Sequence, residues 1–304
     1  MKEITVEVLV GLPASGKSTY AKNKVKESDY TFTHLTSDGI REEFDYNISN
    51  SEVFNLMESR MFFCMTKGLS IIYDATNLNA KRRRSLVNKI KGFAKNHRDS
   101  MRVEINCRLF LQPMDILYER NEKRTGRACV PEYVIERMFK QFQIPMKWEG
   151  FNNIIVDSSS EGDELPIEDI CIMKQDNPYH SYDLGEHLAV ANNYAIVHQY
   201  SYCVVAAALY HDVGKLMVKE FDEQGVAHYY NHENTGAYML ALHFLKHNVL
   251  DNERYWYIVE LVNYHMRPYV WQKSAKAVKR DTDLFGSDFI EDLLNVFYCD
   301  QYAH

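Results

Sequence analysis

The sequence predicts two domains of different class, an α/β domain with a parallel sheet followed by an all-α domain. In the first half, apolar and often β-branched segments alternate with helical stretches. In the second half, helix-compatible runs follow one another without convincing strands. Between them, residues 157–178 are polar and acidic and have no periodicity, so they are expected to form a linker. The expected domains are therefore 1–156 and 179–304.

Each element of the first domain is predicted from its own segment. The expected strands are 3–10, 31–36, 69–74, 103–111 and 153–156. The expected helical stretches are 17–26, 39–67, 80–97, 113–123 and 131–142. This alternation predicts a parallel sheet with helices on both faces, and ligands bind such sheets at the carboxyl ends of the strands.

Composition bounds the class of protein. A chain of 304 residues has room for two domains, and 25% charged residues is an ordinary globular value. No apolar run approaches the roughly 20 residues that span a bilayer, and residues 1–3 precede a strand rather than a signal-peptide pattern. Six scattered cysteines without a C-x-x-C pair predict reduced thiols, and we expect a cytoplasmic protein without a membrane partner.

Charge differs between the two halves. Residues 1–156 hold 25 Lys and Arg against 19 Asp and Glu, whereas residues 179–304 hold 9 against 16. A basic first half suits a polyanionic substrate. An acidic second half suits metal ions bound by carboxylates and imidazoles.

A glycine-rich loop follows the first expected strand and precedes the first expected helix. Residues 11–19 fit the pattern G-x-x-x-x-G-K-[ST] of a phosphate-binding loop. Glycines let backbone N–H groups face phosphate oxygens, and the helix N-terminus adds a favourable dipole. Lys17 is expected to reach the β- and γ-phosphates of a nucleotide, and the Ser18 hydroxyl to hold Mg²⁺. The expected nucleotide-binding residues of this loop are Gly11, Ser15, Gly16, Lys17, Ser18 and Thr19.

Two acidic residues lie at the ends of neighbouring expected strands. Asp38 is placed to accept the proton of an attacking hydroxyl, and Arg41 would lie on the same helix face. Asp74 would help to hold Mg²⁺ through a water, or to position the acceptor. For both carboxylates, capping of the following helix is the alternative role.

Two basic segments follow. Residues 81–98 contain eight Lys or Arg and no Asp or Glu, which predicts either a phosphate-binding face or a solvated helix. In residues 119–131, basic side chains cluster beside a glycine. This pattern predicts a mobile lid that brings Arg120 or Arg124 to the nucleotide phosphates, the alternative being a solvated helix end.

Four segments in order resemble the kinase domain of bacteriophage polynucleotide 5′-hydroxyl kinases: the loop 11–19, Ser37-Asp38-x-x-Arg41, residues 76–79, and Arg120-Asn121-x-x-Arg124 running into Val130-Pro131. The resemblance covers 1–150 and implies a P-loop kinase fold that binds ATP, or another nucleoside triphosphate, with Mg²⁺. It implies that Asp38 is the general base on the 5′-hydroxyl, that Arg41 contacts the acceptor phosphate, and that Arg124 contacts the donor phosphates. One departure is that Ala75 separates Asp74 from the Thr-Asn pair, a form shared by many small P-loop kinases.

Histidine is concentrated in the second half. The expected helices there are 184–198, 201–214, 231–247, 252–264 and 287–302. The apolar run before His211-Asp212 ends in Val-Gly-Lys, so an imidazole and a carboxylate are presented together at a helix end. Such a pair can bind a divalent metal if other ligands join it.

The order of these residues resembles the HD phosphohydrolase superfamily over 179–304: a histidine, then His-Asp-x-Gly-Lys, two further histidines and a late aspartate. The resemblance implies an all-α HD domain with one metal bound by His187, His211, Asp212 and Asp300. A second metal is implied at His232 and His265, with Asp212 bridging. Lys215 would bind a phosphate oxygen. The donor set allows Mn, Fe, Co, Ni or Zn.

Other histidines and acids are assigned to ordinary roles. Asp281 and Asp283 are weaker rivals of Asp300, because they are expected in a charged loop. Surface or core positions are expected for His180, His198, His228, His243 and His247, with His180 flanking the site as an alternative.

Together these patterns predict a bifunctional end-healing enzyme. The kinase would phosphorylate 5′-OH polynucleotide ends from ATP, and the HD domain would remove a 2′ or 3′ phosphate or open a 2′,3′-cyclic phosphate. RNA is favoured over DNA, and a separate RNA ligase is the expected partner. The alternatives are a kinase of a small metabolite or nucleoside, joined to an HD nucleotidase or to an HD nucleotide sensor.

Overall fold

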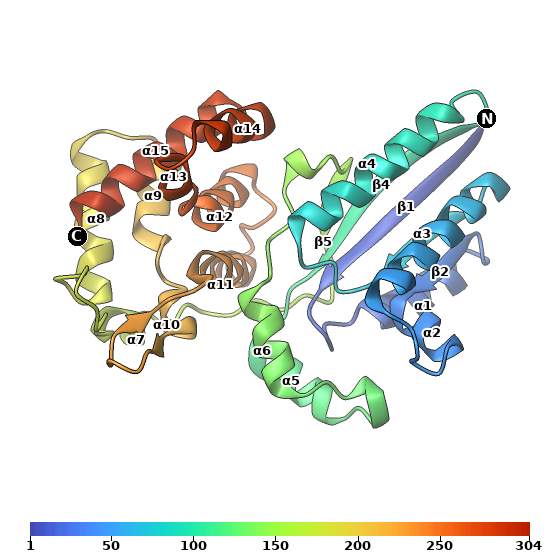
Figure 1. Cartoon of the computed structure of the whole chain (residues 1–304), viewed down its shortest axis with the longest axis horizontal. Helices are drawn as coiled ribbons and strands as arrows, with labels where there is room; N and C mark the ends of the chain where they lie inside the picture. Colours follow the sequence, from blue (N-terminus) through green and yellow to red (C-terminus); the bar gives the residue numbers. More distant parts are fainter. The chain divides into compact units, whose positions relative to one another are not determined.

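The computed structural model describes all 304 residues, which divide into two compact units (Figure 1). The first unit comprises Met1–Pro131 and Pro145–Ser160, and the second comprises Glu132–Ile144 and Glu161–His304. The segment Glu132–Ile144 thus groups with the second unit, although the sequence placed it within the first domain.

A five-stranded parallel sheet forms the centre of the first unit, in the order β2-β3-β1-β4-β5 (Figure 1). The strands are β1 (Lys2–Gly11), β2 (Phe32–Thr36), β3 (Ser70–Asp74), β4 (Met101–Phe110) and β5 (Asn153–Val156). All five lie where the sequence predicts them. In the central strand β1, the side chains of Val6, Val8, Leu9 and Val10 are fully buried, as expected for a strand covered on both faces.

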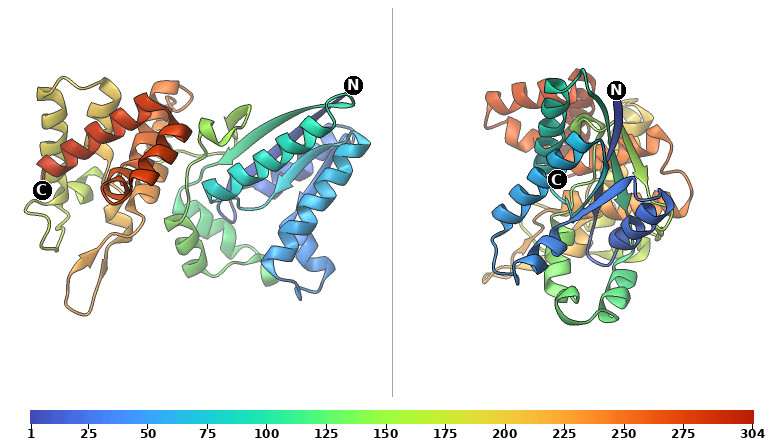
Figure 2. Two further views of the ribbon diagram at one scale, coloured as in Figure 1. Left: turned by 45° about the horizontal axis from the view of Figure 1, so that its top comes forward. Right: turned by 90° about the vertical axis from the view of Figure 1, so that its right-hand side faces the viewer.

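Helices cover both faces of this sheet. They are α1 (Lys17–Glu27), α2 (Ser37–Glu43), α3 (Asn50–Lys67), α4 (Ala80–Asn96) and α5 (Met114–Glu122), with short 3₁₀ turns η1 (Gly126–Ala128) and η2 (Lys147–Glu149). Ala21 of α1 packs against Leu9 and Phe110 on one face. Since side chains alternate along a strand, Val8 and Val10 point to the opposite face, where they are equally buried. Figure 2 shows the sheet and the helices that cover it in two further views.

The helical stretch expected over 39–67 is divided into two helices, because the chain breaks between α2 and α3. Asp45 and Tyr46 adopt φ of 48° and 61°, a left-handed conformation that no helix continues through. Ser49 and Glu52 then form a reciprocal capping box at the start of α3. The sequence Ser-x-x-Glu carries this signal.

The second unit is helical. Its helices are α6 (Glu132–Lys140), α7 (Ile167–Ile172), α8 (Leu184–Val197), α9 (Tyr202–Tyr210), α10 (Lys215–Val218), α11 (His232–Lys246), α12 (Glu253–Tyr264), α13 (Arg267–Trp271), α14 (Ala275–Phe285) and α15 (Ser287–Tyr302). Phe139 at the end of α6 and Phe142 just after it pack edge-on against Tyr238 of α11. These contacts explain why α6 belongs to this unit.

Three short elements depart from the expectation. The stretch 157–178 contains α7 and buries Leu165, Ile170 and Met173, so much of it is packed rather than a free linker. Its apolar positions are too few and too interspersed with acids to show a period. A two-residue antiparallel hairpin, β6 (Glu220–Phe221) with β7 (Ala227–His228), interrupts the helices.

Small side chains let three helices of the second unit approach closely. Ala191 and Ala195 of α8, Ala208 of α9 and Cys299 of α15 form one fully buried cluster. The same three helices carry or directly precede His187, His211 and Asp300, so this packing sets their separation. All six cysteines are free thiols. None of the helices combines the length and the apolar character that crossing a membrane requires.

Candidate active sites

The loop between β1 and α1 has the geometry of a phosphate cradle. β1 ends at Gly11 and α1 begins at Lys17, so the loop joins a strand end to a helix N-terminus. Gly16 has a φ of 104°, which L-residues rarely adopt. A side chain at Gly11 would place its Cβ 2.7 Å from Ser15 Oγ. The backbone conformation therefore favours glycine at position 16, and the close approach of Ser15 favours glycine at position 11.

Lys17 is folded back over the loop. Its ammonium donates to the Leu12 carbonyl at 2.7 Å and to Ser15 Oγ at 3.3 Å. Burial lowers the pKa of Lys17 to about 8, Arg124 adds to this effect, and Asp74 and Asp38 oppose it. Arg124 of the predicted lid and the carboxylates of Asp38 and Asp74 therefore lie close enough to Lys17 to shift its pKa.

Asp74 contacts the predicted magnesium ligand. The Ser18 hydroxyl donates to Asp74 Oδ2 at 2.9 Å, and His34 Nε2 lies 2.9 Å from the same oxygen. The alternative role for Asp74 is wrong, because Asn79 caps α4. A hydroxyl beside a buried carboxylate is a donor set that fits Mg²⁺. Sequence reasoning missed His34, whose position on β2 becomes meaningful only once β2 is paired with β3.

Asp38 lies in the first turn of α2 and is largely exposed, with 80% of its side chain accessible. Thr36, and not Asp38, caps this helix. Arg41 donates to Asp38 Oδ1 at 3.2 Å and to Asn50 Oδ1 at 2.8 Å, so it orients the carboxylate from one turn away. An exposed, oriented carboxylate near Lys17 is able to accept a proton from an incoming hydroxyl.

A cavity of about 630 Å³ adjoins the phosphate-binding loop. Its lining includes Gly16, Thr19, Arg120 and Arg124, together with residues 157–159. The Arg124 guanidinium also donates to the Ala128 carbonyl at 3.3 Å, which ties it to the segment expected to act as a lid. The two arginines that the sequence singled out thus face the same space as the loop.

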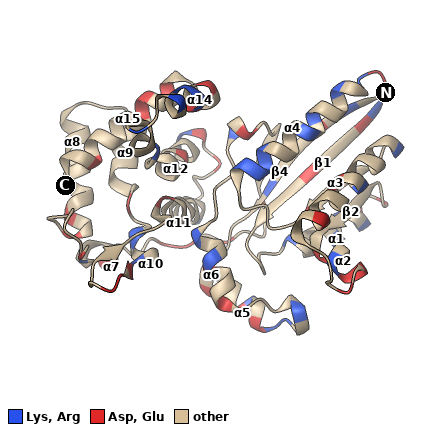
Figure 3. Cartoon of the chain, viewed as in Figure 1, with Lys and Arg blue, Asp and Glu red and all other residues tan.

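The basic face predicted for residues 81–98 is only partly exposed. Figure 3 shows Lys and Arg gathered along α4. Arg83, however, is fully buried and forms a bidentate pair with Glu149, with both N···O distances at 2.7 Å. Arg83 also donates to the Asn77 carbonyl, and so supports the polar strand end rather than a phosphate.

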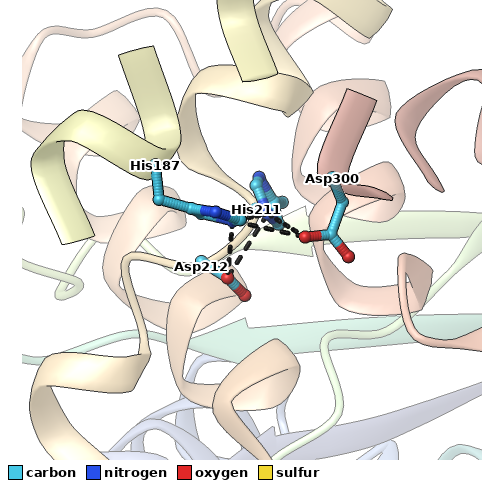
Figure 4. A group of neighbouring side chains, drawn as sticks. All are labelled: His187, His211, Asp212 and Asp300. Carbon is cyan, nitrogen blue, oxygen red and sulfur yellow. Dashed lines mark hydrogen bonds and ion pairs between the residues drawn. The ribbon is translucent and has the colours of Figure 1, made fainter. Parts of the chain in front are cut away.

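Four side chains converge in the second unit (Figure 4). His187 comes from α8, His211 and Asp212 follow α9, and Asp300 comes from α15. His187 Nε2 lies 3.2 Å from His211 Nε2, 3.3 Å from Asp212 Oδ2 and 3.2 Å from Asp300 Oδ1. Ligands about 2.05 Å from a tetrahedral ion are about 3.3 Å apart, so these spacings match a metal centre.

A second group shares Asp212. Its Oδ1 lies 3.0 Å from His232 Nε2 and 3.5 Å from His265 Nε2, and the two imidazole nitrogens are 3.1 Å apart. Oδ1 of Asp212 thus serves this group while Oδ2 serves the first. A carboxylate that offers one oxygen to each of two groups has the form of a bridge between two ions.

Backbone carbonyls orient all four imidazoles. The Nδ1 atoms of His187, His211, His232 and His265 lie 2.8–3.1 Å from the carbonyls of Ala303, Ala208, Tyr229 and Val262. When Nδ1–H donates to a carbonyl, the neutral imidazole keeps a lone pair on Nε2. Each Nε2 lies beside a carboxylate oxygen or another Nε2. Lone pairs facing one another in a buried space require a cation, so these residues fit divalent metal ions.

Neighbouring charged side chains shift the pKa values of Asp212 and His211. Burial opposes ionisation of Asp212, yet Lys215 and the imidazoles keep its pKa well below its ordinary value. Burial likewise opposes a charge on His211, yet Asp212 and Asp300 raise its pKa to about 10. The site therefore favours positive charge between two carboxylates.

Lys215 lies at the edge of both groups. Its ammonium is 2.6 Å from Asp212 Oδ2, 2.9 Å from Gln175 Oε1 and 3.1 Å from His180 Nε2. Burial, together with the Lys215 charge, lowers the pKa of His180 to about 3, so His180 is neutral. His180 therefore flanks the site, as the sequence analysis allowed.

Two partners of Asp300 were missed. Tyr269 donates its hydroxyl to Asp300 Oδ2 at 2.7 Å, and His304 Nε2 lies 3.2 Å from Oδ1. Neither belongs to a motif. His304 lies four residues beyond Asp300, just past the end of α15, so the i, i+4 spacing carried the signal.

The expectation that Asp281 and Asp283 lie in a charged loop is wrong, because both lie on helix α14. Asp281 is buried. Arg267 and the Trp271 indole both donate to its Oδ2. Asp281 therefore has a structural role, and its hydrogen-bond donors do not include the histidines of the two ligand groups.

Two different family models match successive parts of the chain. Residues 6–145 match the AAA domain family model AAA_33, and residues 180–300 match the HD domain family model. L-seryl-tRNA(Sec) kinase of Methanococcus maripaludis is 30% identical over 145 residues, which are 45% of this chain and 52% of that protein. The chain thus spans about half the length of that curated relative.

Solved structures are similar to about half of the chain. A fungal RNA kinase is 16% identical with a TM-score of 0.41, covering 54% of this chain and 78% of that one. A chain of the Pnkp1/Rnl/Hen1 RNA repair complex is 25% identical with a TM-score of 0.39, covering 46% and 44%. The first part of the chain therefore has the P-loop kinase fold and matches the AAA domain model, and the helical second part matches the HD domain model.

Proposed function

We propose that this chain is a bifunctional nucleic-acid end-healing enzyme, which phosphorylates 5′-OH ends and removes 2′ or 3′ phosphate, including cyclic phosphate, from RNA. The observation that carries the proposal is the pairing of two sites with complementary chemistry. One site presents an oriented carboxylate beside a phosphate cradle. The other presents two groups of metal ligands that share Asp212.

In the kinase site, residues of the chain bind the donor phosphates and orient the acceptor hydroxyl. Backbone N–H groups of the loop and Lys17 hold the donor phosphates, and Arg120 and Arg124 close over them from the lid. Mg²⁺, when bound at Ser18 and Asp74, neutralises charge on the transferring phosphoryl group. Asp38 takes the proton of the attacking hydroxyl, and Arg41 holds Asp38 in place and contacts the acceptor phosphate.

In the HD site, six residues would hold two divalent ions: His187, His211, Asp212, Asp300, His232 and His265. Divalent ions in such a site lower the pKa of a water and stabilise charge on a phosphate. Lys215 is placed to contact a phosphate oxygen, since it already lies at 2.6 Å from the shared carboxylate. Tyr269 and His304 orient Asp300.

A polynucleotide acceptor is supported by charge and exposure. The segment 1–156 has six more basic than acidic residues, with many of them on α4. Asp38 is largely exposed, so a large acceptor has access to it. The products, a 5′-phosphate and a free hydroxyl, are the ends that an RNA ligase joins, and a ligase is therefore the proposed partner.

A second candidate comes from the curated relative, which is named as a kinase of L-seryl-tRNA(Sec). Because this relative is 30% identical over 145 residues, a hydroxyl borne by an aminoacylated tRNA is a rival acceptor.

Competition among acceptors tests the proposal. With labelled ATP and Mg²⁺, we expect a 5′-OH RNA oligonucleotide to be phosphorylated, and neither seryl-tRNA nor millimolar nucleoside to inhibit it strongly. Asp38→Asn should lose this transfer while retaining ATP binding. If seryl-tRNA or a nucleoside is the better acceptor by kcat/KM, the end-healing proposal is wrong for this site.

A further inference from the structure

A third group of metal-binding side chains lies outside both sites. It consists of Glu164, just before α7, together with His243 near the end of α11 and His247, which caps that helix. We propose that these three residues form a surface site for a divalent transition metal of the zinc class. The proposal is independent of the end-healing function.

The geometry of this group is that of ligands around one ion. His243 Nδ1 and His247 Nε2 each lie 3.1 Å from the same atom, Glu164 Oε2. All three donor atoms lie within 4.8 Å of one another. Ligands at about 2.05 Å from a tetrahedral ion are about 3.3 Å apart, and the HD ligands show the same spacing. Two imidazoles and one carboxylate are a donor set that zinc, cobalt and nickel accept.

Backbone contacts, rather than flexible side chains alone, set the positions of the ligands. His243 and His247 are one helical turn apart, so both imidazoles project from one face of α11. The Asp163 amide donates to the Leu242 carbonyl at 3.2 Å. A side chain at Gly162 would place its Cβ 2.2 Å from the Lys246 nitrogen, so only glycine allows this approach. Glu164 is therefore delivered to the histidine pair by the path of the chain.

The same unit contains an ordinary histidine–carboxylate pair for contrast. His228 Nε2 lies 2.9 Å from Asp222 Oδ2, and no second imidazole joins them. A single pair of this kind needs only one proton between its atoms. In the Glu164 group, two imidazole nitrogens converge on one oxygen, an arrangement that a shared cation satisfies directly.

The location indicates a stabilising role. His247 and Glu164 are each about half exposed, which leaves room for a water as a fourth ligand. An ion there would fasten the segment that re-enters the second unit at Glu161 to α11, the helix that also carries His232. His243 lies 11 residues beyond His232, roughly 16 Å along a helix, so the site is separate from the HD centre.

Zinc stoichiometry of the full chain tests the proposal. Protein is incubated with a small excess of Zn²⁺, passed through a desalting column, and analysed for bound metal. We expect wild type to retain about one zinc equivalent more than the His243→Gln/His247→Gln variant, because a site with three ligands loses two of them. The matched control His228→Gln should equal wild type. Phosphatase activity of the double variant should be unchanged, because the HD ligands are intact.

A milder variant protects the test against misfolding. Glu164→Gln changes an exposed residue, and it should weaken zinc retention without changing the melting temperature of metal-free protein. Zinc should raise the melting temperature of wild type more than that of Glu164→Gln, because binding to the folded state alone stabilises it. Equal zinc content in wild type, Glu164→Gln and the double variant would overturn the proposal.

Discussion

The two active sites are built in opposite ways. In the kinase site, Asp38 is 80% exposed and its partner Arg41 is held by a single neighbouring helix, so the site is open. In the HD site, His187 and His211 are almost completely inaccessible, and every ligand is tied to the backbone or to a neighbouring side chain. The open arrangement gives the large acceptor that we propose access to the Asp38 carboxylate. The HD site is a preformed, buried cluster whose donor atoms are already placed for metal ions.

The largest expected effect is at the shared carboxylate of the HD site. Asp212→Asn removes negative charge from both groups of ligands at once, so phosphatase activity should fall by about 10³-fold or more. Bound metal should fall with it. Kinase activity should remain within about twofold, and a parallel loss of kinase activity would contradict the separation of the sites. Phosphate release and 5′-end labelling measure the two activities on one preparation.

The next effect is at the open site. Asp38→Asn should lower kcat for phosphoryl transfer by about 10²- to 10⁴-fold, because it removes the proton acceptor. The KM for ATP should hardly change, since Asp38 does not bind the donor. Arg41→Ala should give a smaller loss in kcat. An Asp38→Asn variant with wild-type kcat would remove Asp38 from its proposed role.

A stability effect of moderate size is expected at the buried Arg83–Glu149 pair, in which Arg83 also donates to the Asn77 carbonyl. Arg83→Met leaves the Glu149 carboxylate buried without its partner, and should cost about 3–5 kcal/mol in the free energy of unfolding. Arg83→Met with Glu149→Leu should recover much of that loss. Urea denaturation of the three proteins checks this, and a double variant as unstable as the single one would argue against charge burial as the cause.

The smallest effect is a pH dependence of ATP binding. The charged form of Lys17 binds phosphate, and its pKa in the free protein is lowered by burial to about 8. Affinity should therefore be constant below pH 8 and fall above it. The KM for ATP should rise by up to about tenfold per pH unit until the pKa of the bound form is reached. Lys17→Arg should show a flat profile over the same range, which separates Lys17 from other titrating groups.

Local patterns made much of this structure predictable. The five strands, the phosphate-binding loop and the His-Asp pair are each contained in fewer than about a dozen consecutive residues, so their signals need no knowledge of contacts. Ser49 and Glu52 show that even the break between α2 and α3 had a local signal.

The remaining features depend on residues that are far apart in the sequence. Arg83 and Glu149 are 66 positions apart, and the hydrogen bond from Tyr269 to Asp300 joins residues 31 positions apart. His34 meets Asp74 only through strand pairing. The group at Glu164 requires an acidic segment to fold onto α11, which composition alone does not predict. Pairings of this kind follow from packing.

The most direct test of the central claim uses one short RNA that carries a 5′-OH and a 3′-phosphate. Wild type, Lys17→Ala and Asp212→Ala are each incubated with it, ATP, Mg²⁺ and Mn²⁺, and both ends are resolved. We predict that wild type changes both ends, that Lys17→Ala leaves only the 5′-OH unchanged, and that Asp212→Ala leaves only the 3′-phosphate unchanged. The account is contradicted if wild type alters neither end, or if each variant loses both reactions.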